Sequence, residues 1–405
     1  MKLHLNDMLY VLSYALDCVE AEFLGAKSYH SARVAYICVR IGETYGMSQD
    51  ELLRLAGAAV MHDSALTEFK SVGKADRVRP EVRDGSPNSL QAHCEMGEVN
   101  ASILPFYEYI QGAVLYHHEN ADGTGAFKKT AADTPLLAQL IHLGDRLDNQ
   151  FRLDFVDDAK YNRMIAYLQR ESGRSFSPDI AQRFQKMFPA PMRAELEGER
   201  TGALLRAALP QQLQEYCAAQ IQSLAAVFAK IIDYKSHFTC THSRGIAEKS
   251  GQLGAFLGMD TEKCTKLYLA GALHDIGKLA IPAKILEKPD KLTKEEFEVM
   301  KTHVKISWDI LQKLNGLADV AEWASFHHEK LNGAGYPFGY AAERLSREDR
   351  MLACVDIYQA LTESRPYKEG FSHEKSISIM QGMVAGGFID ADITKAVDEC
   401  FCVGN

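Results

Sequence analysis

Ten of the fourteen histidines lie in short blocks that occur twice along the chain, and two aspartates accompany each set of five. Packing does not require imidazole in particular, whereas imidazole and carboxylate together are ligands of transition metals. The two sets are therefore candidate metal ligands. The first set is His30, His62, Asp63, His93, His117, His118 and Asp145, and the second is His242, His274, Asp275, His303, His327, His328 and Asp356.

Each set holds too many ligands for one tetrahedral ion and suits two octahedral ions that share a carboxylate. Successive residues on a helix point about 100° apart, so Asp275 can face a second metal while His274 faces the first. The mixture of ligands favours iron, manganese or zinc, and the lack of thiolate argues against structural zinc. Two ions ~3.5–4 Å apart can hold a hydroxide nucleophile and stabilise both oxygens of a phosphoryl displacement.

The two sets belong to an internal duplication. SYHSARVA matches CTHSRGIA, and MHDSALTEF matches LHDIGKLAI, at a near-constant offset (242 − 30 = 212 and 274 − 62 = 212). A segment that mixes proline, glycine and charge lies between the copies at residues 190–210. The duplication predicts a first domain over residues 1–195, a linker and connecting helix over 196–232, and a second domain over 233–405.

Most of each copy is expected to be helical, because alternating β-branched runs bounded by turns are sparse. Apolar residues at helical spacing from Met8 to Phe23 predict a first helix. A heptad-like apolar stripe from Cys217 to Ile231 predicts a helix over residues 211–232 that packs against a neighbouring domain or forms a dimer interface. The predicted fold class is all-α, with two tandem helical domains joined by a helix.

The composition indicates a soluble globular protein of 405 residues, with 46% hydrophobic and 24% charged residues. A net charge of −9 argues against binding to nucleic acid or to an anionic membrane. Nine cysteines without a CxxC pair suit a reducing compartment. The apolar run from Met8 to Leu16 does not fit a signal peptide, and no stretch reaches the roughly eighteen apolar residues of a membrane span, so we expect a cytoplasmic protein.

The second half, from about Asp233 to Phe371, resembles an HD-GYP domain, the cyclic-dinucleotide phosphodiesterase branch of the HD metal-dependent phosphohydrolases. The resemblance rests on HSRGIA, HDIGK, the single His303, HHEKLNGAGYP and DIYQALTESRPYKEG. A His-Asp pair alone is common by chance, whereas these motifs at these spacings are specific. The resemblance implies that both copies are HD-type helical domains.

The resemblance also implies a metal centre with two divalent transition-metal ions, iron or manganese first and nickel or zinc as alternatives. The implied ligands of one ion are His242, His274, Asp275 and Asp356, and those of the other are His303, His327 and His328, with Asp275 as the bridge. The three-metal members of the family carry a glutamate where this chain has Phe238, so two metals are expected. Asn332 replaces the usual aspartate of the HHExxDGxGYP motif, which we expect to affect substrate preference without abolishing activity.

Lys278 lies one helical turn after His274, where its ammonium can stabilise the phosphate or protonate the leaving oxygen; the alternative is a solvated surface lysine. By the resemblance, the other substrate-binding residues are the phosphate-contacting pair Arg365 and Lys368 and the turn of Gly335, Tyr336 and Pro337. That turn shapes the substrate pocket and can also contact a signalling-protein partner.

The first copy keeps all seven ligands, but its surroundings differ. Leu66 takes the position of Lys278, and Ala126-Phe127 takes that of Tyr-Pro in the signature turn. Counted from Asp145, the positions of Arg365 and Lys368 become Asp154 and Asp157, whose carboxylates would repel a phosphodiester. The first domain is therefore expected to be a non-catalytic structural, dimerising or regulatory partner with a vestigial metal site.

The resulting hypothesis is a phosphodiesterase that converts a cyclic dinucleotide to a linear product through a hydroxide held between two metals. A degenerate first copy fused to an intact second one resembles the bacterial phosphodiesterases specific for 3′,3′-cyclic GMP-AMP (3′,3′-cGAMP), so this substrate is favoured over cyclic di-GMP. One alternative is a sensor that binds the cyclic dinucleotide without cleaving it. Another is a different HD chemistry, such as mononucleotide hydrolysis or di-iron oxygenation, although the GYP turn and RPY segment argue against it.

Overall fold

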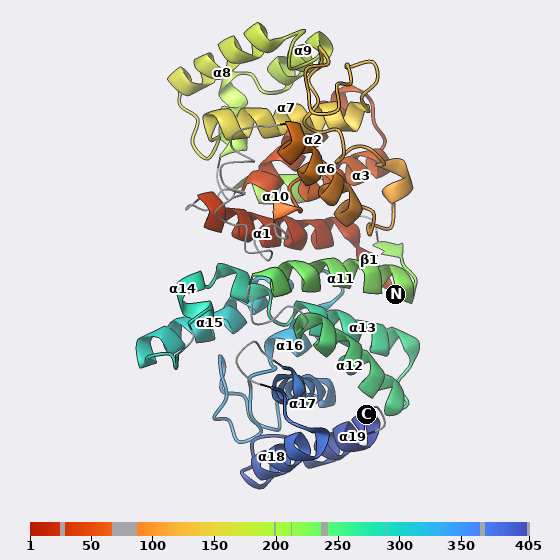
Figure 1. Cartoon of the computed structure of the whole chain (residues 1–405), viewed down its shortest axis with the longest axis vertical. Helices are drawn as coiled ribbons and strands as arrows, with labels where there is room; N and C mark the ends of the chain where they lie inside the picture. Colours follow the sequence, from red (N-terminus) through yellow and green to blue (C-terminus); the bar gives the residue numbers. More distant parts are fainter. Residues whose placement is uncertain are drawn as a thin grey trace. The chain divides into compact units, whose positions relative to one another are not determined.

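The computed structural model of the chain describes residues 1–24, 29–66, 87–197, 200–211, 213–235, 242–288, 290–364 and 369–402 (Figure 1). It divides into two compact units, an N-terminal unit of His4–Leu213 and a C-terminal unit of Met1–Leu3 with Gln214–Asn405. The predicted all-α class is confirmed, since each unit is built almost entirely of helices. No helix in the described part of the chain has both the length and the apolar character that crossing a membrane requires.

The N-terminal unit is coloured red to yellow-green in Figure 1. Helix α2 is its centre and packs against α1, α3, α7, α9 and α10. The elements are α1 (Leu5–Leu24), α2 (His30–Thr44), α3 (Gln49–Met61), α6 (Pro87–Ala101), η1 (Tyr107–Tyr109), α7 (Leu136–Phe151), α8 (Asp158–Glu171), α9 (Pro178–Met187), η2 (Ala190–Leu196) and α10 (Arg200–Ala208).

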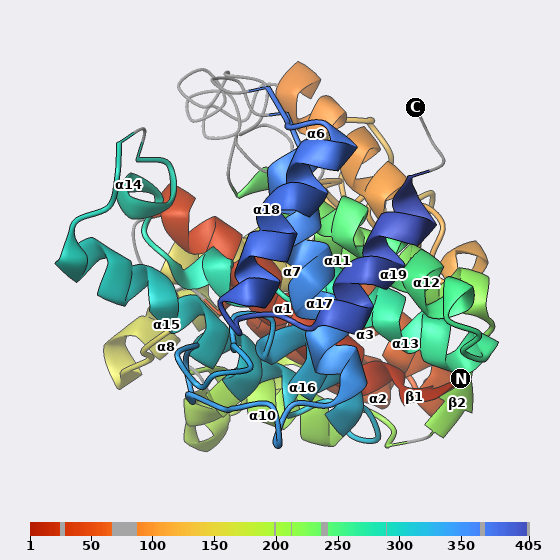
Figure 2. The same cartoon turned by 90° about the horizontal axis from the view of Figure 1, so that it is seen from below.

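The C-terminal unit is coloured green to blue, and Figures 1 and 2 both show α17, α18 and α19 next to one another. Helix α13 is its centre and packs against α11, α12, α16 and α17. The helices are α11 (Ala218–Tyr234), α12 (His242–Phe256), α13 (Thr261–Leu273), η3 (Ile276–Ala280), α14 (Ala283–Leu286), α15 (Lys294–Leu311), α16 (Ala318–Ser325), α17 (Arg347–Thr362), α18 (His373–Ala385) and α19 (Ala391–Phe401).

One small sheet was not predicted from the sequence. Strand β1 (Lys2–His4) pairs with β2 (Leu213–Glu215), and Tyr216 N–H donates to the carbonyl oxygen of Met1 at 2.9 Å. Because β2 occupies the start of the predicted 211–232 helix, α11 begins only at Ala218. The apolar stripe is buried from Ile221 to Ile231, whereas Cys217 at its start is exposed. The helix packs against α12, α13 and η3 of its own unit.

The sequence shows where several of the ligand-bearing helices begin. Capping boxes, in which a hydroxyl side chain and an acidic side chain three residues later satisfy each other's backbone N–H, begin three of them. These pairs are Ser48 with Glu51 at α3, Thr293 with Glu296 at α15, and Ser346 with Asp349 at α17. They define where the helices that carry or precede His62, His303 and Asp356 begin.

Helices α12 and α13 approach each other closely because of Gly271. A Cβ atom there would lie 2.9 Å from Cα of Ala247, so a larger residue would separate the two helices. This approach brings His242, the first residue of α12, to His274, which directly follows α13.

Candidate metal centre

Three imidazoles of the C-terminal cluster are oriented by hydrogen bonds to backbone carbonyl groups. Nδ1–H of His274 donates to the carbonyl oxygen of Gly271 at 2.7 Å, which leaves Nε2 with the lone pair that a metal ion needs. The same bond, to the carbonyl three residues earlier, joins His303 to Met300 at 2.6 Å and His327 to Ala324 at 2.7 Å.

His242 is oriented by a carboxylate instead. Its Nδ1 lies 2.9 Å from Oε2 of Glu363, and its Nε2 lies 3.3 Å from Oδ1 of Asp356. A carboxylate behind a ligating imidazole fixes the ring and raises its basicity. The role of Glu363 was missed from the sequence, although its position seven residues after Asp356 puts both on one helical face.

Asp275 lies between the two groups of imidazoles. Its Oδ2 is 3.0 Å from Nε2 of His274 and 2.5 Å from Nζ of Lys278, and its Oδ1 is 3.4 Å from Nε2 of His303 and 4.0 Å from Nε2 of His327. Only 2% of the Asp275 side chain is exposed. A carboxylate in this position can bridge two ions.

The predicted ligands form two groups, and within each group the donor atoms lie within 4.8 Å of one another. A third group, defined in the same way, shares one histidine with each of the first two. Among the described residues, Nε2 of His274, His303 and His327 and Oδ1 of Asp275 are buried without a hydrogen-bond partner. Buried polar atoms without a partner are unfavourable, and cations at these positions would satisfy them. The residues present therefore fit two metal ions. The groups are His242 with His274 and Asp356, His303 with His327 and His328, and His274 with Asp275 and His327.

The electrostatics of the cluster put Asp275, His303 and His327, but not His242, in the protonation state that binds a metal. Burial opposes ionisation of Asp275, but its interactions with His274 and Lys278 outweigh burial and hold the pKa of this carboxyl well below its usual value. Burial lowers the pKa of His303 to about 3 and that of His327 well below its usual value. Burial acts in the same direction on His242, but hydrogen bonds to Asp356 and Glu363 raise its pKa to about 9. Ionised carboxylates and neutral imidazoles are the forms that bind metals, so His242 has to lose its proton when a metal binds.

Two hydrogen bonds to Ser307 of α15 hold the segment around His274 and Asp275 against the helix that carries His303. Gly277 N–H donates to Oγ of Ser307 at 3.0 Å, and this hydroxyl donates to the carbonyl oxygen of His274 at 3.0 Å. A Cβ atom at Gly277 would lie 1.9 Å from the carbonyl oxygen of His303, so only glycine fits. Sequence reasoning assigned no role to Ser307.

The signature turn is folded around Glu329. Its carboxylate accepts hydrogen bonds from Phe338 N–H at 2.8 Å and Tyr340 N–H at 3.0 Å. The Tyr336 ring lies 4.8 Å from that of His328, so the turn of Gly335, Tyr336 and Pro337 borders the metal ligands. Oδ1 of the exposed Asn332 accepts from Ala334 N–H at 3.1 Å, a turn contact that aspartate would also make.

Gly335→Ala is expected to displace the turn, because the added Cβ would lie 2.4 Å from Cα of Glu329. We expect the variant to unfold at least ~2 kcal/mol more easily, measured by urea denaturation, and to lose most of its hydrolytic activity. Gly382→Ala is the matched control, since nothing lies within 4 Å of its added methyl group in α18. If both substitutions behave alike, the close approach at Gly335 does not restrain the turn.

The structure also brings together the seven candidate ligands of the N-terminal unit. Their donor atoms form two groups, again within 4.8 Å. These groups are His30 with His62, Asp63 and Asp145, and His93 with His117 and His118. Leu66 N–H bonds to the Asp63 carbonyl just as Lys278 N–H bonds to that of Asp275, so Leu66 does occupy the position of the lysine.

The proposed correspondence of Ala126-Phe127 to Tyr336-Pro337 is wrong in register. Glu119 accepts from Phe127 N–H at 2.6 Å and from Lys129 N–H, the bonds that Glu329 makes with Phe338 and Tyr340. Phe127 therefore corresponds to Phe338, and Ala126 alone stands for Tyr336-Pro337. The first-copy turn is one residue shorter than the second-copy turn.

Asp154 and Asp157, the charge-reversed positions of the first copy, both lie at the surface. Asp154 is exposed, and Asp157 caps α8 by accepting from Lys160 N–H at 2.6 Å. Their expected counterparts, Arg365 and Lys368, lie outside the described residues, as does Phe238.

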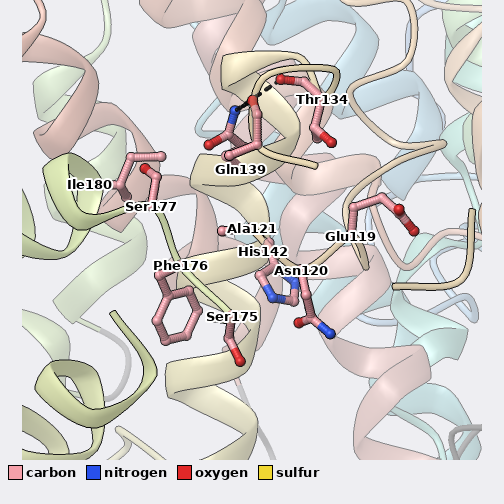
Figure 3. Close-up of a pocket in the computed structure, with 11 residues that line it drawn as sticks. Glu119, Asn120, Ala121, Thr134, Gln139, His142, Ser175, Phe176, Ser177 and Ile180 are labelled. Atoms are coloured by element: carbon pink, nitrogen blue, oxygen red, sulfur yellow. Dashed lines mark hydrogen bonds between the residues drawn. The ribbon is translucent and has the colours of Figure 1, made fainter. Parts of the chain in front are cut away.

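His142 is not one of the candidate ligands of the N-terminal cluster, but it contacts the backbone of one of them. Its Nδ1–H donates to the carbonyl oxygen of His117 at 2.9 Å, and burial lowers its pKa to about 3. Its ring borders a cavity that Phe176, Ser175 and Gln139 also line (Figure 3), and the volume of this cavity is about 10 Å³. This volume suits about one water molecule, which can donate to the buried Nε2.

Comparisons with known proteins agree with two copies of one domain. Residues 28–150 and residues 226–393 each match a family model described as an HD domain. The crystal structure of the cyclic GMP-AMP-specific phosphodiesterase V-cGAP3 of Vibrio cholerae superposes with a TM-score of 0.69 at 21% identity, covering 100% of this chain and 99% of that one. This similarity supports the tandem fold.

Curated relatives match at the level of sequence. The chain is 30% identical to 3′3′-cGAMP-specific phosphodiesterase 1 of Vibrio cholerae serotype O1 over 97% of this chain and 91% of that protein. It is 25% identical to 3′3′-cGAMP-specific phosphodiesterase 3 of that organism, over 98% and 93%. A cyclic di-GMP phosphodiesterase of Thermotoga maritima is 37% identical over 36% of this chain and 42% of that protein.

Proposed function

Because this chain belongs to the HD-domain family as a tandem HD-GYP-type cyclic-dinucleotide phosphodiesterase, we propose that its C-terminal unit hydrolyses 3′,3′-cGAMP in preference to cyclic di-GMP. The observation that carries the preference is the similarity to two 3′3′-cGAMP-specific phosphodiesterases over nearly the whole chain. Similarity to the Thermotoga cyclic di-GMP phosphodiesterase covers about a third of the chain. The two-copy architecture therefore supports this substrate.

The seven residues of the C-terminal cluster are proposed as the ligands that would hold two metal ions, and Asp275 lies between the two groups of imidazoles. When bound, two divalent ions would supply a hydroxide nucleophile and neutralise charge on the phosphodiester. Nitrogen and oxygen donors without thiolate suit iron or manganese, with nickel or zinc as alternatives.

Lys278 is proposed to act on the phosphodiester from beside Asp275. Its side chain is 22% exposed and its Nζ lies 2.5 Å from Oδ2 of Asp275, so the ammonium is at the edge of the cluster and not in bulk solvent. From this position it can donate a hydrogen bond to a phosphate oxygen, or give its proton to the leaving oxygen as the P–O bond breaks. The product is a linear dinucleotide.

The surface next to His328 is proposed to bind the substrate's base. The Tyr336 ring lies 6.3 Å from that of Phe297, and Nζ of Lys301 lies 5.9 Å from the Tyr336 ring and 5.5 Å from the Phe297 ring. Phe297 is 45% exposed although it is large and apolar. Two aromatic rings with a cation between them suit a stacked purine and its phosphate. Phe297 and Lys301 were not predicted from the sequence.

Tyr336→Ala is expected to raise KM for the cyclic dinucleotide about tenfold with a smaller change in kcat, because base stacking on an aromatic ring contributes roughly 1–3 kcal/mol. The kinetics are measured with both cyclic dinucleotides. Phe256→Ala, which removes another exposed phenyl ring (49% exposed, in α12), is the control. An unchanged KM in Tyr336→Ala would exclude stacking at this position.

The proposed substrate is tested with the purified full chain, Mn²⁺ or Fe²⁺, and 3′,3′-cGAMP or cyclic di-GMP in parallel reactions resolved by chromatography. We expect linear pApG or pGpA to form faster than linear pGpG. Faster formation of pGpG would overturn the preference. No linear product from either nucleotide, with metal confirmed bound, would overturn hydrolysis of both and favour a sensor.

A further inference from the structure

We propose that Glu363 is a positioning residue that links the proposed phosphate-binding segment to the metal ligand His242. Through this residue, the segment that carries Arg365 and Lys368 would set how tightly His242 holds its ion. The inference rests on the proposed metal centre and on the proposed role of Arg365 and Lys368. It does not depend on which cyclic dinucleotide the C-terminal unit hydrolyses.

The first copy holds the equivalent histidine from inside a helix. Nδ1 of His30 lies 2.7 Å from Oδ2 of Asp148, whose Oδ1 accepts from Nε of Arg33 at 2.8 Å and from Leu153 N–H at 2.9 Å. Asp148 and Arg33 are both buried, and they belong to α7 and α2. The packing of α2 on α7 therefore holds the carboxylate behind this ring.

The second copy has neither residue of this ion pair. The offsets that align the ligands place Gly245 at the position of Arg33 (245 − 212 = 33) and Gln359 at that of Asp148 (359 − 211 = 148). The Gln359 amide packs against α12, since a Cβ atom at Gly245 would lie 2.5 Å from its Nε2. Its Oε1 is buried without a hydrogen-bond partner among the described residues. An uncharged amide thus fills the place of the first-copy carboxylate.

Glu363 supplies the carboxylate from a different place in the fold. Its Oε2 lies 2.9 Å from Nδ1 of His242, and it directly follows Thr362, the last residue of α17. Its first-copy counterpart is Arg152 (363 − 211 = 152), so the charge at this position is reversed between the copies. The supporting carboxylate has moved by four positions, from the interior of a helix to its end.

The end of α17 forms the base of the segment with the proposed phosphate-binding residues. Phe371 N–H donates to the carbonyl oxygen of Leu361 at 2.8 Å, and Gly370 N–H donates to Oγ of Ser364 at 3.1 Å. These two bonds join the strand of chain that enters the segment to the one that leaves it. Both residues of the phosphate-binding pair lie between these ends in the sequence, and Glu363 lies in the base itself.

A carboxylate in this base couples the segment to the metal ligand. The partner behind a ligating histidine typically changes metal affinity about 10–100-fold. When a phosphodiester binds to Arg365 and Lys368 and fixes the base, Glu363 is held against His242 and the ion binds more tightly. By linkage, the bound ion raises the affinity for the phosphodiester by the same factor. Asp148 is fixed by α7 instead, so the first copy lacks this coupling.

The test is the affinity of the full chain for Mn²⁺, measured by competition with a chelator in the absence of turnover. Glu363→Gln is expected to weaken Mn²⁺ binding about 10–100-fold, because it removes the charge behind the imidazole at nearly unchanged size. Asp275→Ala identifies the part of the binding isotherm that belongs to the C-terminal cluster. Glu374→Gln, at an exposed glutamate in the first turn of α18, is the matched control and should bind Mn²⁺ as wild type does.

A triple variant returns the carboxylate to its first-copy place by combining Gly245→Arg, Gln359→Asp and Glu363→Gln. The shorter side chain at position 359 relieves the 2.5 Å contact between an added Cβ at Gly245 and the Gln359 amide. We expect the Mn²⁺ affinity to return to within about threefold of wild type. Addition of linear pApG should tighten Mn²⁺ binding roughly tenfold in wild type and at most about threefold in the triple variant, since its carboxylate is no longer part of the base.

Wild-type Mn²⁺ affinity in Glu363→Gln would overturn the positioning role. A triple variant in which pApG tightens Mn²⁺ binding as strongly as in wild type would overturn the coupling. One that binds Mn²⁺ no better than Glu363→Gln would overturn the exchange of roles between Asp148 and Glu363. If the triple variant does not fold, Gln359→Asp with Glu363→Gln replaces it in the same measurements. Failure of the proposed hydrolysis would leave the Mn²⁺ isotherms unchanged, so the two failures are distinguishable.

Discussion

Asp275→Ala is expected to abolish hydrolysis of the cyclic dinucleotide, with a loss on the order of 10³-fold or more in kcat/KM, equivalent to about 4 kcal/mol of transition-state stabilisation. The reason is that Asp275 lies within 4.0 Å of three imidazole Nε2 atoms and 2.5 Å from Nζ of Lys278. Its removal takes away the carboxylate proposed to bridge the two ions. The measurement is product formation together with the metal content of the C-terminal centre.

Asp309→Ala is the matched control for this prediction. Asp309 is a half-exposed aspartate of α15 that pairs with Lys305 at 2.6 Å on the surface. Surface ion pairs of this kind contribute little, so activity and metal content should stay near those of wild type. Substantial hydrolysis by Asp275→Ala with the wild-type metal content would contradict the bridging role.

Lys278→Leu is expected to lower kcat about 10²-fold while leaving both metal ions in place. The substitution gives the second copy the residue that the first copy has at Leu66. Lys278 reaches the cluster through Asp275 and is not itself a candidate ligand, so its loss should remove charge stabilisation or proton donation without removing metal. This pattern separates it from Asp275→Ala, where metal and activity fall together.

The measurement is steady-state kinetics across a pH series, with metal content determined on the same samples. Lys278→Arg keeps the charge but donates a proton much less readily, because the guanidinium stays protonated. Recovery of activity in Lys278→Arg indicates charge stabilisation, whereas an activity as low as that of Lys278→Leu indicates proton donation. Wild-type kcat in Lys278→Leu would exclude both roles.

The sequence by itself determined the fold class and the candidate ligand set. The spacing of His274-Asp275, His327-His328 and Asp356 recurs in both copies, and residue types at fixed helical spacing carry this information locally. Capping pairs such as Thr293 with Glu296 are also local, because they join residues three apart. These features do not depend on how distant segments meet.

Only the tertiary structure decided which side chains support and surround the ligands. Glu363 meets His242 across 121 residues, and Asp148 meets His30 across 118, so no local pattern pairs them. The pairing of β1 with β2, which delays the start of α11, likewise joins the two ends of a segment of some two hundred residues. Hydrogen bonds between distant segments depend on the packing of whole helices, and the sequence shows each partner without showing that they meet.

The signature turn is the clearest case in which the sequence supplies the residues and the tertiary structure decides how they correspond. The sequence contains the glycines and the glutamate of both copies, but it leaves open where the first copy is one residue shorter. The carboxylates of Glu119 and Glu329 resolve the register, because each accepts two backbone N–H groups at positions that only the folded turn reveals. Backbone hydrogen bonds fix which residues are equivalent, and they form only when the turn closes around its glutamate.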